Sequence, residues 1–96
     1  MIKIKGRAIT AARDLLKLTQ HGLAAACQIS NGTLSRIEAE SVTPHADTIR
    51  KIAKELTRRG IEFTNGTGVG VRLDYKRAAE YEESLKAVAT TDKNPG

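Results

Sequence analysis

The sequence of 96 residues predicts a mainly α-helical fold: a group of short helices, then a β-hairpin, then one more helix. Two observations support this prediction. Before Gly60, apolar residues recur at helical spacing, in segments that begin with residues suited to cap a helix. After Gly60, apolar residues alternate with other residues on either side of a glycine-rich turn. The chain therefore changes from helix to strand at this glycine.

Four helices are expected in the first 59 residues. The first spans about residues 9–18, with apolar positions at Ile9, Ala12, Leu15 and Leu18. Thr19 and Ser30 begin the second and third helices, because a hydroxyl at the N-cap accepts hydrogen bonds from unpaired N–H groups of the first turn. Thr43 and Pro44 predict the start of the fourth helix, since proline favours the first helical position.

The third helix carries the most informative surface. Leu34 and Ile37 form its apolar seam, so the other residues point away from it. These are small, polar or cationic: Asn31, Gly32, Thr33, Ser35 and Arg36. Two short helices joined by a tight turn, the second with polar side chains outside, are the layout of a DNA-reading helix-turn-helix. The sequence therefore predicts that this helix offers its outer face to DNA.

The segment after the fourth helix is expected to form a β-hairpin. Apolar alternation runs over residues 61–64 and again over 69–73, and residues 65–68 between them have the composition of a turn. A final segment, residues 75–88, has apolar residues at roughly helical spacing. The remaining residues, 89–96, are polar and are expected to form a flexible tail.

The predicted organisation has three parts: a DNA-binding domain over residues 1–59, an extension over residues 60–88 and the tail. A two-stranded hairpin is marginal in water unless another surface covers one of its faces. The alternating Ile2–Lys5 segment, the last helix or a second copy of the chain could provide that cover. We therefore expect the extension to build a homodimer or to bind a protein partner.

The charge of the chain is uneven. The formal net charge is +5, and the sequence pI is about 9.7. Residues 1–59 hold 11 Lys and Arg against 5 Asp and Glu, a net +6, whereas residues 60–96 hold 5 against 6, a net −1. Positive charge attracts polyanions, so a nucleic acid is expected to bind the helical part. Lys54, Arg58 and Arg59 on the fourth helix are expected to face solvent.

No residues suggest an enzyme, a cofactor or a metal site. Cys27 is the only cysteine, which excludes an intrachain disulfide, and its apolar helical position indicates a buried small side chain. His21 and His45 share no ligand spacing with Cys27 or with an acidic cluster. No apolar run reaches membrane-spanning length, and the N-terminus lacks the apolar core of a signal peptide. A reducing cytoplasm is the expected location, without a membrane partner.

Several motifs resemble those of one known family. They are Ala12–Leu16, Thr19–Ala24, Ile29–Ser30, Thr33–Glu38 and Thr48–Ile52. Together they are similar to the Xre/Cro phage-repressor family of helix-turn-helix regulators. Residues 60–66 and 70–73 resemble a bacterial branch with a short C-terminal β extension. The resemblance covers about residues 8–73. It implies a four-helix Cro-like domain. It also implies a protein of a bacterium or a phage that acts in the cytoplasm, at the nucleoid.

The resemblance also implies roles for individual residues. Gln20 corresponds to a glutamine that hydrogen-bonds a DNA phosphate at the start of the second helix. Arg13 and Glu38 match a partly buried ion pair that ties the first helix to the end of the third. Two positions depart from the pattern. Gln28 stands where the family usually has a left-handed glycine, and Gly22 stands where it has an acidic or polar helix former.

In the family, the exposed first half of the third helix contacts base edges. By this likeness, Arg36 is expected to pair with guanine, Asn31 with adenine, and the methyl of Thr33 with a thymine methyl. Gly32 is expected to let the backbone approach DNA closely, and Ser35 completes the expected DNA-binding set.

Two functions from different classes remain open. The first is a sequence-specific transcriptional regulator, a repressor that occupies a palindromic operator as a dimer. The second is a protein-interaction module, an antitoxin or an anti-activator whose C-terminal part binds another protein, with autoregulatory DNA binding. Neither function needs a cofactor, and no ligand pocket is predicted.

Overall fold

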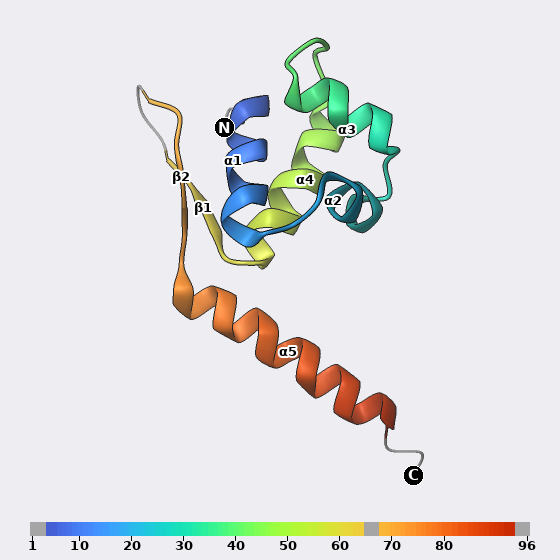
Figure 1. The fold of residues 1–96 in the computed structure, drawn as a ribbon, viewed down its shortest axis with the longest axis vertical. Helices are drawn as coiled ribbons and strands as arrows, with labels where there is room; N and C mark the ends of the chain where they lie inside the picture. The colour runs from blue at the N-terminus through green and yellow to red at the C-terminus, as the bar shows by residue number, and fades with distance from the viewer. Residues whose placement is uncertain (1–3, 65–67, 94–96) are drawn as a thin grey trace.

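The computed structural model describes residues 4–64 and 68–93. Four helices come first: α1 (Gly6–Leu16), α2 (Gln20–Cys27), α3 (Asn31–Glu38) and α4 (Ala46–Arg58). They are followed by an antiparallel hairpin of β1 (Ile61–Phe63) and β2 (Val71–Leu73), and then by α5 (Tyr75–Lys93). Figure 1 shows the first four helices grouped together, the hairpin along one side and α5 below them. The predicted fold class, mainly helical with a hairpin and a final helix, is confirmed.

The core lies where α1 to α4 meet. Its largest fully buried side chains come from all of these helices and from β1: Ile9, Leu23, Leu34, Ile52, Leu56 and Ile61. Burying one side chain of this size stabilises a fold by about 1.5–3 kcal/mol. Cys27 packs in the same cluster as a small apolar side chain. Because Ile61 belongs to β1, the first strand shares the core of the helical group.

Two of the predicted helix starts are confirmed. Thr19 Oγ1 accepts a hydrogen bond from the backbone N–H of Gly22, with a donor–acceptor distance of 2.9 Å. Ser30 Oγ accepts one from the backbone N–H of Thr33 at 3.0 Å. α1 begins at Gly6, three residues earlier than predicted.

The predicted start of α4 was wrong. α4 begins at Ala46 with His45 as its N-cap, so Thr43 and Pro44 lie in the preceding loop. Pro44 is half-buried there and lines a pocket together with Ile37 of α3. The helix therefore begins two residues after Pro44, and the local preference of proline for a helix start does not decide its beginning.

Positive φ angles occur at three non-glycine residues of the described chain: Lys17 (54°), Gln28 (59°) and Glu40 (60°). Gln28 follows α2, and its backbone N–H donates to the carbonyls of Ala24 and Ala25, which ends the helix. The left-handed conformation costs an ordinary residue about 1–2 kcal/mol. The turn therefore keeps the geometry that a glycine would adopt, with strain at Gln28.

The hairpin packs on its own chain. β1 and β2 pair in antiparallel register, with Ile61 opposite Leu73, and their apolar side chains contact the core. β2 lies along α1 (Figure 1). Ile4 packs against the core in an irregular segment, while Ile2 and Lys3 lie outside the described residues. The contact of α1 with the hairpin was not predicted from the sequence. Cover by a strand of residues 2–5 falls partly outside the described residues, and cover by a second copy stays a prediction.

α5 starts at Tyr75 and continues to Lys93, beyond its predicted end at Val88, so the expected tail is helical up to that lysine. It lies at the opposite end of the molecule from α3 and runs away from the helical group (Figure 1). Gly60 has a φ of 113°, and a β-carbon there would lie 3.0 Å from the backbone nitrogen of Ala78. This glycine therefore allows α5 to approach the end of α4. In the described part of the chain, no helix has both the length and the apolar character needed to cross a membrane.

Candidate nucleic-acid interface

α3 presents a polar outer face. Leu34 and Ile37 are buried in the core, which decides which side of the helix faces outward. Four of the predicted contact positions are exposed: Asn31, Gly32, Ser35 and Arg36. The fifth, Thr33, is half-buried. The structure therefore brings these five positions together on one helix of about two turns.

The first turn of α3 is held by a reciprocal contact between two residues. Ser30 Oγ accepts from the backbone N–H of Thr33 at 3.0 Å and donates to Thr33 Oγ1 at 2.8 Å. Capping of this kind stabilises a helix by about 0.5–2 kcal/mol. Since the hydroxyl of Thr33 is engaged in the cap, its methyl group is the part that remains for an apolar contact.

Arg36 supplies the positive charge of this face. A β-carbon at Gly32 would lie 3.5 Å from Arg36 Nη1, so the guanidinium folds back over the first turn of α3. Within the described ranges, Arg36 takes part in no ion pair. An unpaired guanidinium presents a fork of N–H donors that matches the O6 and N7 acceptors of guanine.

Gln20 links the start of α2 to the end of α3. Its Nε2 donates to Glu38 Oε1 at 3.3 Å, and its side chain is half-buried. The N-terminus of a helix carries partial positive charge and unpaired N–H groups, which favour an anion. Gln20 therefore places an oriented side-chain amide beside the backbone N–H groups at the start of α2, which attract negative charge.

Arg13 and Glu38 form an ion pair between α1 and α3. Arg13 Nε lies 2.8 Å from Glu38 Oε2, and Nη2 lies 2.8 Å from Oε1. The two side chains are 15% and 6% exposed, so water screens the pair only slightly. Burial by itself would raise the pKa of Glu38, but hydrogen bonds from Arg13 and Thr10 together lower that pKa below its ordinary value. The hydrogen bond to Glu38 raises the pKa of Arg13. Both groups are therefore charged at neutral pH.

Two contacts at the end of α3 were missed by the sequence analysis. A β-carbon at Gly6 would lie 2.2 Å from the carbonyl oxygen of Ile37, so α1 touches the backbone of α3. Arg7 donates to the carboxylate of Glu40 from its backbone nitrogen at 3.2 Å and from Nη2 at 3.1 Å. Gly6 lies before the predicted first helix, and the only signal for a close contact there is that this residue has no side chain.

A second charged cluster joins α4 to α5, at the end of the molecule away from α3. Glu55 is buried and accepts from Arg58 Nη2 at 2.8 Å and from Arg59 Nε at 2.6 Å. Both guanidinium groups lie over the ring of Tyr81, 5.1 and 5.2 Å from its centre. Arg59 is half-buried, so the expectation that it faces solvent was wrong. Its side chain lies between Glu55 and the ring of Tyr81.

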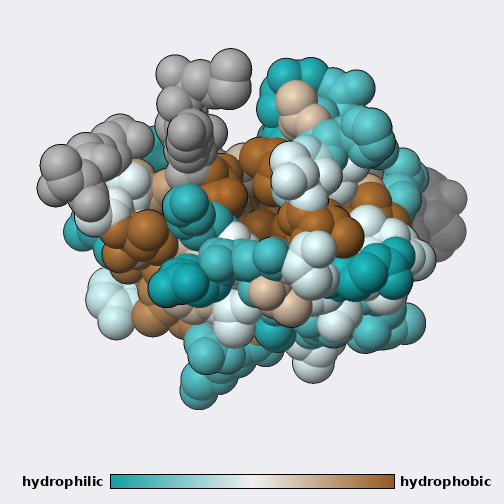
Figure 2. Space-filling model, turned by 90° about the horizontal axis from the view of Figure 1, so that it is seen from above, coloured by the Kyte–Doolittle hydropathy of each residue, from teal (hydrophilic) through white to brown (hydrophobic). Residues whose placement is uncertain are grey.

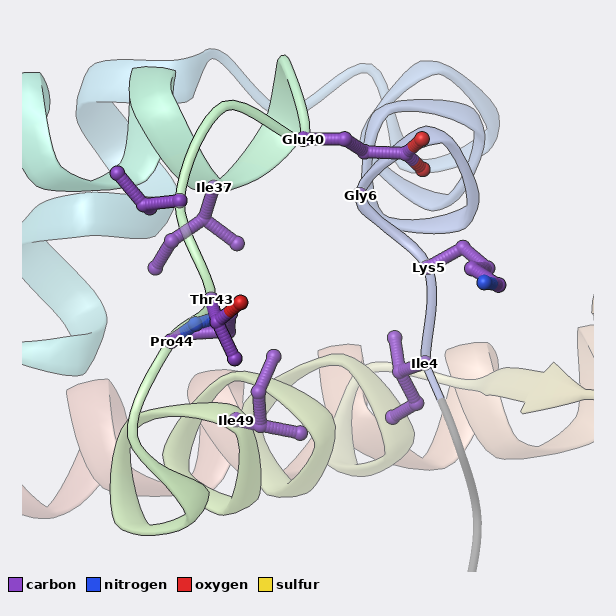
Figure 3. Close-up of a pocket in the computed structure, with 9 residues that line it drawn as sticks. Ile4, Lys5, Gly6, Ile37, Glu40, Thr43, Pro44 and Ile49 are labelled. Carbon is purple, nitrogen blue, oxygen red and sulfur yellow. The ribbon is translucent and has the colours of Figure 1, made fainter.

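A pocket of about 230 Å³, lined by both apolar and polar residues, lies beside the end of α3 (Figure 3). Its apolar wall is formed by Ile4, Gly6, Ile37, Val42, Pro44 and Ile49. The start of α1 and the loop before α4 lie at this end of the molecule (Figure 1). Figure 2 views the same end and shows a band of apolar residues between polar ones. This pocket was not predicted, because its walls come from three separate segments of the chain.

Comparison with known proteins agrees with this geometry. Residues 9–62 match the model of a family described as helix-turn-helix. The crystal structure of the clp gene regulator ClgR from Corynebacterium glutamicum is similar, with a TM-score of 0.52 and 18% sequence identity. The similarity covers 91% of this chain and 78% of that chain, and at this identity it concerns the fold alone. No curated protein matches the sequence.

Proposed function

This chain belongs to the Xre-type helix-turn-helix family of DNA-binding transcriptional regulators, and from that premise we propose that it is a repressor that occupies a palindromic operator as a dimer. The main observation that supports this proposal is the outer face of α3. It is polar, and it includes Arg36, which forms no ion pair with any residue that the structure describes. It also belongs to the part of the chain, residues 1–59, that carries 11 basic against 5 acidic residues. A dimer bound over a promoter would block RNA polymerase.

α3 is proposed to lie in the major groove with its first half against the base edges. Arg36 donates to guanine O6 and N7, Asn31 pairs with adenine, and the methyl of Thr33 contacts a thymine methyl. Gly32 lets the backbone of α3 come close to the DNA, and Ser35 lies on the same exposed face. A good bidentate contact of this kind discriminates against the wrong base by about 1–3 kcal/mol.

Gln20 and the N-terminus of α2 are proposed to hold a phosphate of the DNA backbone. Such a contact sets the position of the protein on the duplex without reading its sequence. The contact from Gln20 to Glu38 supports this role, since it ties the phosphate-binding residue to the helix that reads the bases.

The dimer is proposed to form through α5 and the groove beside it. The apolar side chains of β1 and β2 pack against the core, and β2 lies along α1. A groove of about 350 Å³ lies between α5 and the end of α1, where Leu15 and Leu85 are 44% and 48% exposed. Exposed apolar surface of this kind favours a partner. The two α3 helices would lie about 34 Å apart, to read half-sites one DNA turn apart.

Selection of bound sequences from a random duplex pool tests the proposal and defines the operator. The expected result is a palindrome with half-sites one turn apart, bound more weakly as salt rises, because neutralised phosphates release counterions. A pool without any enriched sequence, or binding that does not depend on salt, would contradict DNA-binding repression.

A second candidate function is supported by the same exposed leucines on α5 and α1. In this alternative, an antitoxin or anti-activator binds a different protein through α5, and DNA binding is autoregulatory. Light scattering on the full chain, alone and with operator DNA, separates the two. A dimer favours the repressor, whereas a chain that stays monomeric at high concentration and on DNA favours the partner-binding module.

A further inference from the structure

The carboxylate of Glu38 lies where α1, α2 and the end of α3 meet. Its Oε1 accepts from Thr10 Oγ1 at 2.9 Å, from Arg13 Nη2 at 2.8 Å and from Gln20 Nε2 at 3.3 Å. Its Oε2 accepts from Arg13 Nε at 2.8 Å. Only 6% of the Glu38 side chain is exposed, so protein groups satisfy the carboxylate in place of bulk water. The carboxylate of Glu38 is therefore held in one position, and the side chains that donate to it are oriented toward that position.

From this geometry we propose that Glu38 is a positioning residue for DNA binding: it orients the amide of Gln20 so that the remaining N–H of that amide meets a DNA phosphate. The inference rests on the proposed function, in which Gln20 holds a phosphate. Glu38 acts through Gln20 and does not itself contact DNA.

The direction of the Gln20 amide follows from the chemistry of its partner. An ionised carboxylate only accepts hydrogen bonds, so the NH2 end of the amide faces Glu38 and the carbonyl end does not. Glu38 takes one of the two N–H bonds. A phosphate oxygen also only accepts, so the second N–H is the part of this side chain that can bind it. The donor is thus oriented before DNA arrives, which reduces the entropy cost of ordering it on binding.

Arg13 removes the repulsion that a negative Glu38 would exert on a phosphate. Its two N–H donors, one on each carboxylate oxygen, balance the charge of Glu38. Arg13 Nη1 also donates to the carbonyl of Leu18 at 3.1 Å, two residues before Gln20. One guanidinium therefore neutralises Glu38 and anchors the backbone that leads into α2. Gln20, the proposed phosphate-binding residue, is consequently fixed relative to α3, the proposed base-reading helix.

A double-mutant cycle in the full chain tests the proposal, using Gln20→Ala, Glu38→Ala and the double variant. The probe is a duplex carrying the sequence selected from the random pool. Gln20→Ala is expected to weaken binding about tenfold, the equivalent of one hydrogen bond. It should leave the salt dependence unchanged, because glutamine carries no charge. In the Glu38→Ala background, the same change is expected to alter binding by less than about twofold.

Thr10→Val is the matched control. It removes another donor to Glu38 Oε1 while leaving the contact with Gln20, so it is expected to lower the melting temperature without weakening DNA binding. If Gln20→Ala weakens binding equally in both backgrounds, Glu38 has no positioning role and the inference is overturned. If the unmodified chain binds no duplex in the pool, the proposed function fails instead.

An NMR measurement decides the question if Glu38→Ala does not fold. The side-chain NH2 resonances of Gln20 are identified by their loss in Gln20→Ala. Adding the duplex is expected to shift one proton of the pair more than the other, because one meets phosphate and the other stays on Glu38. Equal shifts, or none, while the backbone resonances of α3 respond to DNA, would overturn the proposal.

Discussion

Gly6 in α1 faces the backbone of Ile37 in α3 so closely that a β-carbon at Gly6 would lie 2.2 Å from the Ile37 carbonyl oxygen. The same β-carbon would lie 2.7 Å from the carbonyl oxygen of Glu38. Both oxygens belong to the backbone of α3, so neither can move aside without moving the helix. This contact therefore sets how closely α1 approaches the end of the proposed DNA-reading helix.

Gly6→Ala is expected to destabilise the fold by about 1–3 kcal/mol, because the added methyl overpacks this contact. Urea unfolding followed by circular dichroism measures the change. Gly68→Ala is the control, since a β-carbon there meets nothing within 4 Å. A Gly6→Ala variant as stable as the control would show that the end of α3 can shift to make room for the added methyl group at little cost in stability.

Gly32→Ala is expected to act in the opposite direction on stability. Its β-carbon would lie at an ordinary contact distance, 3.5 Å, from Arg36 Nη1. Alanine favours a helix over glycine by up to about 1 kcal/mol, so the melting temperature should rise. Operator affinity should fall, because the methyl occupies the space through which the backbone is proposed to approach DNA. Unchanged affinity in the stabilised variant would place the DNA away from Gly32.

Arg36→Ala is expected to relax the choice of base at one position of the operator by about 1–3 kcal/mol. Its melting temperature should stay close to that of the unmodified chain, because the side chain is exposed. Repeating the selection from the random pool measures the change, and Lys54→Ala, which removes an exposed positive charge from α4, is the control. An equal loss of affinity for operator and random DNA would reassign Arg36 to the phosphate backbone.

Tyr81→Ala is expected to loosen α5 from α4. The change removes two cation–π contacts, with Arg58 and Arg59, of about 0.5–1 kcal/mol each. Hydrogen exchange should become faster in α5 while α1 to α4 keep their protection. Tyr75→Ala is the control, because Tyr75 lies on the same helix and is 83% exposed. Equal exchange in the two variants would show that the arginines do not hold α5.

Acid is expected to destabilise the fold through Glu38. Burial opposes ionisation of Glu38, but hydrogen bonds from Arg13 and Thr10 leave its folded-state pKa below the ordinary value. The pKa of Glu55 is shifted in the same direction. A lowered pKa means that the unfolded chain takes up protons first as pH falls. The stabilisation is therefore complete above the ordinary glutamate pKa of about 4.3 and is lost as pH falls through the folded-state pKa.

The urea midpoint measured from pH 7 down to pH 3 checks this dependence, with Glu38→Gln as the comparison. The midpoint of the unmodified chain should fall as pH decreases, and that of the variant should fall less. Superimposable pH profiles for the two proteins would mean that Glu38 is not the group responsible.

Local features of the chain were predicted well, because their causes lie within a few residues. Thr19 and Ser30 cap helices through hydroxyls that reach the N–H three residues ahead. Leu34 and Ile37 are one helical turn apart, so they share the buried side of α3 and leave its polar residues outside. Contact of these polar residues with DNA stays a prediction, because it depends on a partner that the chain does not contain.

The start of α4 was not predicted correctly by rules that consider only neighbouring residues. Thr43 and Pro44 have the composition of a helix start, yet both lie in the loop between α3 and α4, where they line a pocket that Ile37 also lines. The course of this loop depends on how α3 and α4 are placed in the fold, and no rule about neighbouring residues includes that placement.

The order of helices and strands, two of the caps and the outer face of α3 follow from the amino-acid sequence, since each depends on spacing within one turn or one hairpin. Three contacts could be found only in the folded chain: α1 lies along the hairpin, Gly6 meets Ile37 and Arg59 meets Tyr81. These partners are more than 20 residues apart along the chain. They meet because whole helices pack to bury the apolar core, and the contacts of one helix with another depend on that packing rather than on any local spacing of residues.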